Sequence, residues 1–322
     1  MPRVTIGRRV RRYDKKRGCY VYDIGFKTQT PLTERTAEVA EAFGLGVDEA
    51  QEHVLYRDFE VRLAEGDVVY ITGDSGSGKS VLLRALREDL GGEAATMDEL
   101  EAPGDRPIID LVGGSFREAL RLLSRVGLND AYLFLRRPSH LSDGQRYRFR
   151  IAQLLDMGRP YWLCDEFCST LDRTTARIVA YNVQELARRG GATLIVATTH
   201  TDLFDDLNPS IHIHKGWGEE ISIEYNANAE APDCTVARDV TVEESSMEEY
   251  ARLGYLHYRG HGVVAPIGFF SLKRGGDLVG VIAYTYPAPA AAGRVKAVGY
   301  RPRLKELNRD WALISRVIVH PK

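Results

Sequence analysis

Cysteine is scarce in this sequence, as are methionine, with four residues, and tryptophan, with three. Four cysteines are spread over 322 residues, and only Cys164 and Cys168 stand close together. No framework of regularly spaced pairs is visible, which argues against a small disulfide-stabilised secreted protein and favours a reducing compartment. No second pair of Cys or His stands at metal-ligand spacing, so we expect Cys164 and Cys168 to be small buried residues.

Long apolar runs are also missing. No uninterrupted apolar stretch approaches the ~20 residues that a membrane-spanning helix requires. Arg and Lys interrupt the N-terminal residues, so the start of the sequence does not resemble a secretory leader. The net charge of −2 gives the chain as a whole no bias toward one sign of charge. We therefore expect a cytoplasmic protein without a membrane partner.

One stretch of the sequence predicts a specific site. Residues 73–80 read GDSGSGKS and fit the phosphate-loop pattern G-x-x-x-x-G-K-[ST]. The apolar residues 68–72 before the loop predict a buried strand, and the leucines of residues 80–90 after it predict a helix. Glycines are needed because the backbone wraps a phosphate with its N–H groups pointing inward, and the helix adds its positive end.

We expect this loop to bind the phosphates of a nucleoside triphosphate. Lys79 would reach the β- and γ-phosphates, and the Ser80 hydroxyl would ligate Mg²⁺. An ordinary Gly/Ser-rich turn is the alternative, which the order of strand, loop and helix disfavours. The expected nucleotide-binding residues of this stretch are Gly73, Asp74, Ser75, Gly76, Ser77, Gly78, Lys79, Ser80 and Val81.

Three further segments suit phosphate chemistry. Residues 141–145, LSDGQ, open a basic helix whose N-terminal end could bind an anion, although a Ser N-cap explains them equally well. The strand-like residues 161–164 end in Asp165 and Glu166; the first acid can hold Mg²⁺ and the second can orient or deprotonate an attacking water. His200 follows a third apolar segment and could sense a γ-phosphate, or it is an ordinary surface histidine.

The order of these motifs resembles that of the ABC-class ATPases. The resemblance covers about residues 54–225 and rests on the phosphate loop, LSDGQ, the acidic pair Asp165-Glu166, the STLD that follows it, and His200. It implies an α/β fold of the P-loop NTPase type, with an ABC-type nucleotide-binding domain. It also implies ATP and Mg²⁺ as cofactors and a homodimer that forms on ATP binding.

The resemblance further implies a role for each matching residue. Lys79, Glu166 and His200 would be catalytic, with Glu166 as the base. Ser80 and Asp165 would hold the metal ion. The residues that contact ATP bound to a second copy would be Ser142, Gly144 and Gln145. Asp172 would lie at the seam, the interface between the two copies. The aromatic residues upstream of the phosphate loop that could stack on adenine are Tyr22, Phe26 and Tyr56.

The sequence departs from the ABC pattern in several places. Phe167 and Cys168 stand where the family has Pro-Thr, and Asp143 replaces the second glycine of the signature. No glutamine occurs in residues 110–115, where the family's Mg²⁺-coupling glutamine belongs, and Asp110 is the residue that could replace it. The interval from Lys79 to the signature is 63 positions, shorter than in transporters, whose helical lobe grips the membrane subunit. The chain thus resembles a soluble ABC ATPase rather than a transporter motor.

We expect four segments along the chain. Residues 1–53 form a basic N-terminal segment and an insertion, residues 54–225 the ATPase domain, residues 226–232 a linker, and residues 233–322 a smaller domain. Within residues 1–17, six Arg and two Lys face a single Asp. Such a run could neutralise nucleic-acid phosphates, or it is a solvated, partly disordered tail.

Short elements complete the expected secondary structure of the first two segments. We expect a strand at residues 18–26, a helix at residues 33–43 and a β-hairpin at residues 54–72. Residues 107–112 predict a further core strand. A helix follows it, with one face formed by Phe116, Leu120 and Leu123.

Residues 233–322 resemble the N-terminal half of a GNAT-type acetyltransferase. The expected order is a strand at 235–242, a helix at 247–260, a hairpin that turns at Gly275-Gly276, and a strand at 311–320. The resemblance implies a C-terminal α+β GNAT-like half domain. The family's pyrophosphate-binding loop would come after Lys322, so we expect no acetyl transfer; any small α+β appendage is the alternative.

The leading interpretation of the whole chain is ATP hydrolysis that drives association and release of two ATPase domains. The first alternative is an ATP-dependent clamp on nucleic acid. The second is an ATP-gated acetyltransferase-like module, which the absence of the CoA loop disfavours.

Replacement of Lys79 by alanine tests the phosphate-loop assignment. The variant should fold like the parent and bind ATP at least about ten-fold more weakly, because a charge-assisted contact is worth about 1.5–3 kcal/mol. Titration calorimetry measures this affinity, and equal binding by parent and variant would remove the assignment.

Overall fold

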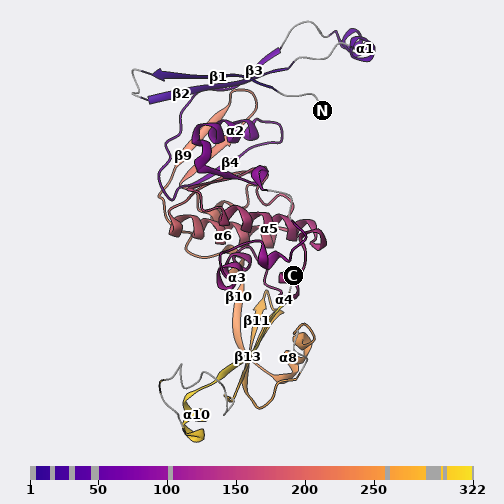
Figure 1. The fold of residues 1–322 in the computed structure, drawn as a ribbon, viewed down its shortest axis with the longest axis vertical. Coiled ribbons are helices and arrows are strands. Elements are labelled where there is room, and N and C mark those ends of the chain that lie inside the picture. Colours follow the sequence, from indigo (N-terminus) through magenta and orange to yellow (C-terminus); the bar gives the residue numbers. More distant parts are fainter. Residues whose placement is uncertain are drawn as a thin grey trace. The chain divides into compact units, whose positions relative to one another are not determined.

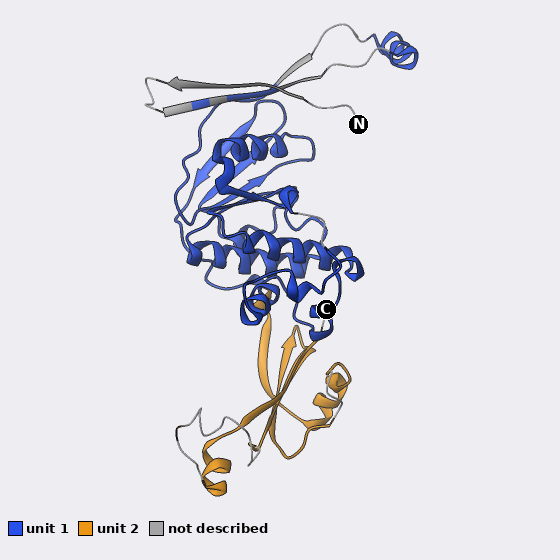
Figure 2. Cartoon of the chain, viewed as in Figure 1, with its two compact units in different colours: residues 1–235 blue, residues 236–322 orange. Residues whose placement is uncertain are grey.

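The chain folds into two units, residues 1–235 and residues 236–322 (Figures 1 and 2). The computed structural model describes residues 5–14, 19–28, 33–44, 51–100, 104–257, 262–287, 299 and 303–320. Unit 1 contains two sheets and two hydrophobic core clusters, and unit 2 contains one sheet and one core cluster. Among the described helices, none is both long and apolar enough to cross a bilayer.

Six short strands form the central sheet of unit 1. In spatial order they are β5 (Ala94–Thr96), β6 (Tyr161–Cys164), β7 (Thr193–Ala197), β4 (Val68–Thr72), β8 (Ile211–Lys215) and β9 (Ile221–Tyr225). All neighbours are parallel except β8 and β9. Every residue of β4 and β7 is buried, as is typical of parallel strands covered on both faces. The strands predicted before the phosphate loop, before Asp165 and before His200 are confirmed.

Each face of this sheet has a separate core because successive strand residues point to opposite sides. Val69 and Ile71 pack on the side of α2 (Lys79–Leu90). Val68 and Tyr70 pack on the opposite side, where the helices α3 (Phe116–Arg125), α5 (Asp143–Asp156) and α6 (Arg173–Gly190) lie. The helix that follows the phosphate loop and the helix that follows LSDGQ therefore lie on opposite faces of the sheet (Figure 1).

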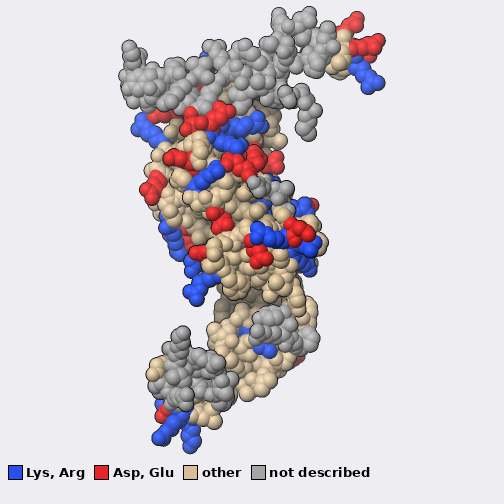
Figure 3. Space-filling view, in the orientation of Figure 1, with Lys and Arg blue, Asp and Glu red and all other residues tan. Residues whose placement is uncertain are grey.

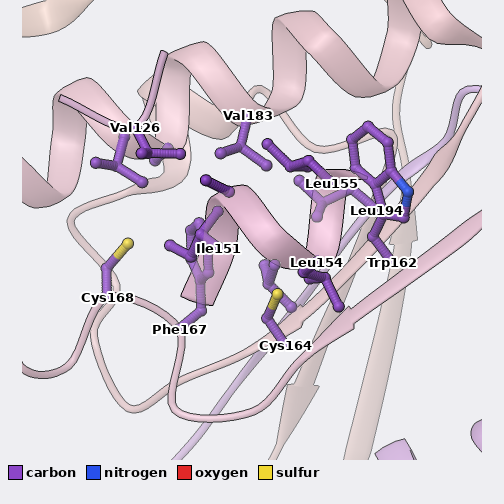
Figure 4. Close-up of a cluster of buried hydrophobic side chains, with 14 of the residues drawn as sticks. Val126, Ile151, Leu154, Leu155, Trp162, Cys164, Phe167, Cys168, Val183 and Leu194 are labelled. Atoms are coloured by element: carbon purple, nitrogen blue, oxygen red, sulfur yellow. The ribbon is translucent and has the colours of Figure 1, made fainter. Parts of the chain in front are cut away.

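The core on the α5 side of the sheet contains Phe167 and Cys168, two of the residues that depart from the ABC pattern. Figure 4 shows Cys164, Phe167 and Cys168 among Ile151, Val126 and other apolar side chains. Cys164 is 1% exposed and Cys168 is 0% exposed, so the prediction that both are small buried residues is confirmed. The described residues contain no group of three or more His, Cys, Asp or Glu that could hold a metal ion.

A three-stranded antiparallel sheet covers α2 on its other side. Its strands are β1 (Thr5–Asp14), β2 (Cys19–Thr28) and β3 (Gln51–Phe59), in the order β1-β2-β3. Helix α1 (Glu34–Phe43) begins at its N-cap Thr33 and ends at Gly44, in the left-handed region at φ 64°. The strand and helix predicted before residue 44 are confirmed.

Two expectations for this region are wrong. Residues 54–72 do not form a hairpin, because β3 pairs with β2 while β4 enters the other sheet. The apolar β4 needs cover on both faces, which a hairpin partner at its edge does not supply. Residues 5–14 of the basic N-terminal run are not a disordered tail, since they form β1, which pairs with β2 from Arg8 to Asp14. The side chains of β1 lie outside the described part, so nucleic-acid contact stays a prediction.

The segment between the phosphate loop and LSDGQ also differs from expectation. Residues 107–112 are not a strand: Ile108–Asp110 form a 3-10 turn, and Ile108 and Val112 reach the core at helical rather than alternating spacing. Phe116 is 72% exposed, because α3 starts there and buries the face of Ala119 and Leu123 instead. Two short helices, α4 (Ala131–Phe134) and α7 (Phe204–Leu207), complete unit 1.

Unit 2 is a four-stranded antiparallel sheet. Its strands β10 (Val240–Ser245), β11 (Pro266–Arg274), β12 (Asp277–Thr285) and β13 (Leu313–Val319) neighbour one another in chain order. Helix α8 (Met247–Gly254) packs on the sheet through Tyr250 and Leu253, and α10 (Leu304–Asp310) precedes the last strand. The predicted hairpin and final strand are confirmed.

The beginning of unit 2 differs in detail. The first strand starts at Val240 rather than Thr235, because both the backbone N–H and the hydroxyl of Thr235 donate to the buried Asp206 carboxylate, at 2.7 Å each. Helix α8 ends at Gly254, earlier than expected, and residues 258–260 of the expected helix lie outside the described part. Residues 226–232 contain no helix or strand, and Asn226 donates to the Pro209 carbonyl oxygen at 3.1 Å.

Replacing Leu194 in β7 by alanine tests the two-sided burial of the central sheet. Leu194 is 0% exposed, so the variant should lose about 2–5 kcal/mol of unfolding free energy through lost burial and the cavity left behind. Leu135→Ala is the matched control, because Leu135 is 69% exposed. Denaturant unfolding measures both variants, and an equal midpoint for the two would contradict this account of the core.

Candidate nucleotide-binding site

The loop between β4 and α2 has the backbone of a phosphate cradle. Gly73, Gly76 and Gly78 have φ of 141°, 81° and 108°, values that side-chain-bearing residues rarely adopt. A Cβ on Gly73 would lie 2.1 Å from the Lys215 carbonyl oxygen, so β8 packs directly against the loop. Gly78 is the N-cap of α2 and has no side chain to cap the helix, which leaves its positive end facing the loop.

The hydrogen bonding of two polar side chains, Ser77 and Lys79, shows whether the loop suits a bound phosphate. Ser77 Oγ is buried and finds no hydrogen-bond partner among the described residues, which is costly unless a bound group or water completes it. Lys79 Nζ donates to the carbonyl oxygens of Gly73, at 2.7 Å, and Asp74, at 2.6 Å. Burial lowers the pKa of Lys79, while the Asp165 and Asp74 carboxylates oppose this shift. The glycine cradle, the orphaned hydroxyl and the ammonium group fit a phosphate.

The acidic pair stands at the same edge of the sheet as the loop. Because β4, β6 and β7 are parallel, their carboxyl ends share one edge, and Asp165 and Glu166 directly follow β6. Both carboxylates are exposed, and Asp165 is close enough to Lys79 to act on its pKa. Ser80, in the first turn of α2, is half-buried. These residues supply the oxygen ligands that Mg²⁺ prefers.

The backbone after β6 is held in an unusual conformation. Glu166 and Cys168 have φ of 48° and 58°, in the left-handed region. The Phe167 N–H donates to the Ala197 carbonyl oxygen at 2.9 Å, and the Cys168 N–H donates to Tyr147 Oη at 2.8 Å. Because Tyr147 belongs to α5, the LSDGQ helix holds the loop that carries Glu166. Sequence reasoning missed this role, since nothing local marks Tyr147.

The thiols beside this loop are structural rather than reactive. Burial raises the pKa of Cys164 to about 12 and that of Cys168 well above its ordinary value. Neither therefore becomes a thiolate near neutral pH. Phe167 and Cys168 fill the core where the family's Pro-Thr stands.

The LSDGQ residues form the N-terminus of α5. Ser142 is the N-cap: its Oγ accepts from the Gln145 N–H at 3.4 Å, and its own N–H donates to Gln145 Oε1 at 3.1 Å. A Cβ on Gly144 would lie 3.4 Å from Leu171 Cδ2, so the STLD segment packs beside it. Helix α5 lies on the opposite face of the central sheet from α2, the helix that follows the phosphate loop.

The structure also gives the positions of three other residues with predicted roles, His200, Asp172 and Asp110. His200 is half-buried at the end of β7, and its carbonyl oxygen accepts a hydrogen bond from Tyr70. Asp172 is the N-cap of α6 and accepts from the Thr175 N–H at 3.0 Å. Asp110 is exposed on its 3-10 turn, so its substitution for the family's glutamine stays a prediction.

Tyr56 is the wrong choice for the aromatic that stacks on adenine. Tyr56 is 0% exposed, and its hydroxyl donates to the Gly78 carbonyl oxygen at 3.0 Å, so it supports the loop from below. The side chains of Tyr22 and Phe26 lie outside the described part. The structure instead places an aromatic that sequence reasoning missed, Trp217, beside Gly76. The only local signal for it is a tryptophan flanked by two glycines after a strand.

Comparison with known proteins assigns the family. The cytochrome c biogenesis ATP-binding export protein CcmA of Rhizobium meliloti is 30% identical over 184 residues, which cover 47% of this chain and 86% of that relative. The chain belongs to the ABC ATPase family. As an ABC ATPase it binds ATP with Mg²⁺ and hydrolyses ATP, as predicted. Its ATPase domain is an α/β P-loop cassette.

Other relatives agree with this assignment. CcmA of Hyphomonas neptunium is 31% identical over 185 residues, covering 52% of this chain and 93% of the relative. The thiamine import ATP-binding protein ThiQ of Vibrio cholerae is 30% identical over 175 residues, covering 44% of this chain and 73% of the relative.

No protein-family model matches the chain. A solved dimeric ATP-binding cassette in a post-hydrolysis state with ADP and Pi aligns with a TM-score of 0.46 and 19% identity, over 62% of this chain and 95% of that one.

Replacing Tyr147 by phenylalanine tests the support of the loop after Glu166. Loss of the hydroxyl leaves the Cys168 N–H unsatisfied, which should cost about 1–3 kcal/mol of unfolding free energy. Misplacement of Glu166 should lower kcat on the order of ten-fold, with ATP affinity unchanged. Tyr132→Phe, at a 60% exposed tyrosine of α4, is the control. Steady-state kinetics with calorimetric ATP binding would reject this role if kcat equals that of the parent.

Proposed function

We propose that two copies of this chain associate head to tail and hydrolyse ATP at their shared seam. The observation that carries the proposal is that α2, which follows the phosphate loop, and α5, which begins at LSDGQ, pack on opposite faces of one sheet. Each chain then offers one half of a nucleotide site at its phosphate loop and the other half at α5. A head-to-tail pair of copies completes both sites at once.

In this proposal, one copy holds the nucleotide and performs the chemistry. Lys79 and the loop N–H groups bind the phosphates, and Ser80 and Asp165 hold Mg²⁺, which supplies charge neutralisation between phosphates. The exposed Glu166 carboxylate accepts a proton from the attacking water. His200, at the same sheet edge, contacts the γ-phosphate.

The second copy contributes the exposed start of α5. Ser142 Oγ accepts from the Gln145 N–H within its own chain, which leaves the Ser142 hydroxyl hydrogen free to donate to a phosphate oxygen. Gly144 lies in the first turn of the helix, where backbone N–H groups and the helix dipole favour an anion. Gln145 keeps Ser142 in position through the reciprocal cap.

We further propose that the ATPase works apart from a membrane transporter and in the cytoplasm. The interval between Lys79 and Ser142 is short, and after α2 the only α-helices among its described residues are α3 and α4, which supports this proposal. The relatives are named as export and import ATP-binding proteins, so an ATPase coupled to a transporter is the second candidate. Activity that appears only with a membrane subunit would favour that candidate.

The GNAT-like half domain also stays a proposal. The chain order of β10, α8, β11, β12 and β13 supports it, as does the antiparallel pairing of all four strands.

An alternative function of the ATPase is an ATP-dependent clamp that binds nucleic acid through the basic strand β1. On the face of unit 1 shown in Figure 3, described Lys and Arg side chains are interspersed with Asp and Glu, so this face offers no surface of one sign.

Replacing Glu166 by glutamine tests the head-to-tail scheme. The amide keeps the shape of the side chain and removes the proton acceptor, so ATP should bind and bridge two copies while hydrolysis falls by about 100-fold or more. Light scattering with and without Mg-ATP measures the dimer, and a phosphate-release assay measures hydrolysis.

A second substitution separates the two halves of the site. Adding Ser142→Arg to Glu166→Gln should abolish the ATP-dependent dimer by steric block at the seam, while ATP still binds each monomer. Hydrolysis by monomeric Glu166→Gln at the parent rate would show that both the base and the seam are assigned wrongly.

A further inference from the structure

An exposed tryptophan lies at the tip of the phosphate loop. Trp217 stands in the turn between β8 and β9 and is 63% exposed. A Cβ built on Gly76 would lie 3.7 Å from Cη2 and 3.9 Å from Cζ3 of Trp217. The six-membered ring of the indole therefore lies directly beside the loop, with much of its apolar surface open to solvent. The exposed indole therefore offers an apolar ring face on which a planar group bound at the loop can stack.

The turn that carries Trp217 is built to hold one conformation. The Lys215 side chain is fully buried at its base, and Nζ donates to the carbonyl oxygens of Gly216, Gly218 and Glu220, at 2.9, 2.6 and 3.3 Å. The Gly216 N–H donates to the Glu220 carbonyl oxygen at 3.0 Å, which closes the turn. A buried ammonium is costly to desolvate unless it is hydrogen-bonded in this way, so the turn and the cation depend on each other.

The same base also supports the phosphate loop. Lys215 Nζ lies 5.2 Å from the centroid of the Tyr56 ring, and Tyr56 donates to the Gly78 carbonyl oxygen. The tip of the turn is tied to β3 by two hydrogen bonds from the Arg57 guanidinium to the Glu219 carboxylate, at 2.8 Å each. Trp217 is thus held relative to the loop by contacts on both sides of its turn.

In the proposed site, a nucleotide would point its base toward this turn. The γ-phosphate must face the acids at the end of β6, which lies on the β7 side of β4. The nucleoside end then extends to the opposite side of β4, where β8 and the turn after it lie. Tyr56 is buried and does not offer a ring face there, whereas Trp217 does.

We infer that Trp217 binds the adenine of ATP by stacking its exposed indole on the base. The inference rests on the proposed phosphate-loop site and adds the residue that recognises the base. The base-binding aromatic would then come from downstream of the phosphate loop in the chain, not from upstream. Every base has a π-face, so stacking contributes to affinity while discriminating little between bases.

The test compares ATP with inorganic tripolyphosphate, which has the phosphates and lacks the base. Titration calorimetry of the full chain with Mg²⁺ measures both ligands for the parent, Trp217→Ala and Trp217→Phe. Trp217→Ala should bind ATP at least about five-fold more weakly and tripolyphosphate equally well, and Trp217→Phe should recover most of the loss. Trp311→Ala, at a 44% exposed tryptophan of unit 2, is the matched control and should bind both ligands as the parent does.

Two results would overturn the role of Trp217. One is parent-like ATP affinity of Trp217→Ala; the other is an equal loss of ATP and tripolyphosphate, which would mean a disturbed loop rather than a lost base contact. Lys79→Ala separates this failure from failure of the site itself. If Lys79→Ala loses both ligands while Trp217→Ala keeps ATP, only the base assignment is wrong; if Lys79→Ala keeps both, the phosphate-loop site is wrong as well.

Discussion

Burial of the central strands on both faces is the constraint on which the rest of unit 1 depends. Every residue of β4 and β7 is buried, so apolar helix surfaces must cover each side of the sheet. The helix after the phosphate loop covers one side, and the LSDGQ helix with its neighbours covers the other. The helices that follow these two motifs therefore pack on opposite faces of the sheet within one chain.

The parallel arrangement of the strands gathers the chemistry at one edge. Carboxyl ends of parallel strands meet at the same edge, so the phosphate loop, the acidic pair and His200 converge although they are far apart in sequence. The surroundings then hold these groups in place: Tyr147 reaches across from α5 to the loop after Glu166, and β8 packs against Gly73. The buried Lys215 stabilises the turn that carries Trp217. Packing around the edge thus determines where each reactive side chain lies.

Expectations from the sequence failed where the pattern was apolar but short. Residues 107–112 have strand-like composition, yet a short apolar run does not distinguish a strand from a turn that buries two residues four apart. The expected hairpin at residues 54–72 failed for a related reason, because local alternation says nothing about which strand is the partner. The strands with all residues buried were predicted correctly, since a continuous apolar run followed by a loop with chemical signals leaves few alternatives.

By itself, the sequence determined the phosphate loop, the acidic pair and the family, because these depend on residue types at fixed local spacing. The glycines at positive φ are required by the loop's own backbone, whatever surrounds it. Only the tertiary structure decided that Tyr56 is buried beneath the loop, that Tyr147 supports Glu166, and that Trp217 stands at the loop tip. Each of these contacts joins segments distant in the chain, and its physical cause is packing between elements, which local spacing does not encode.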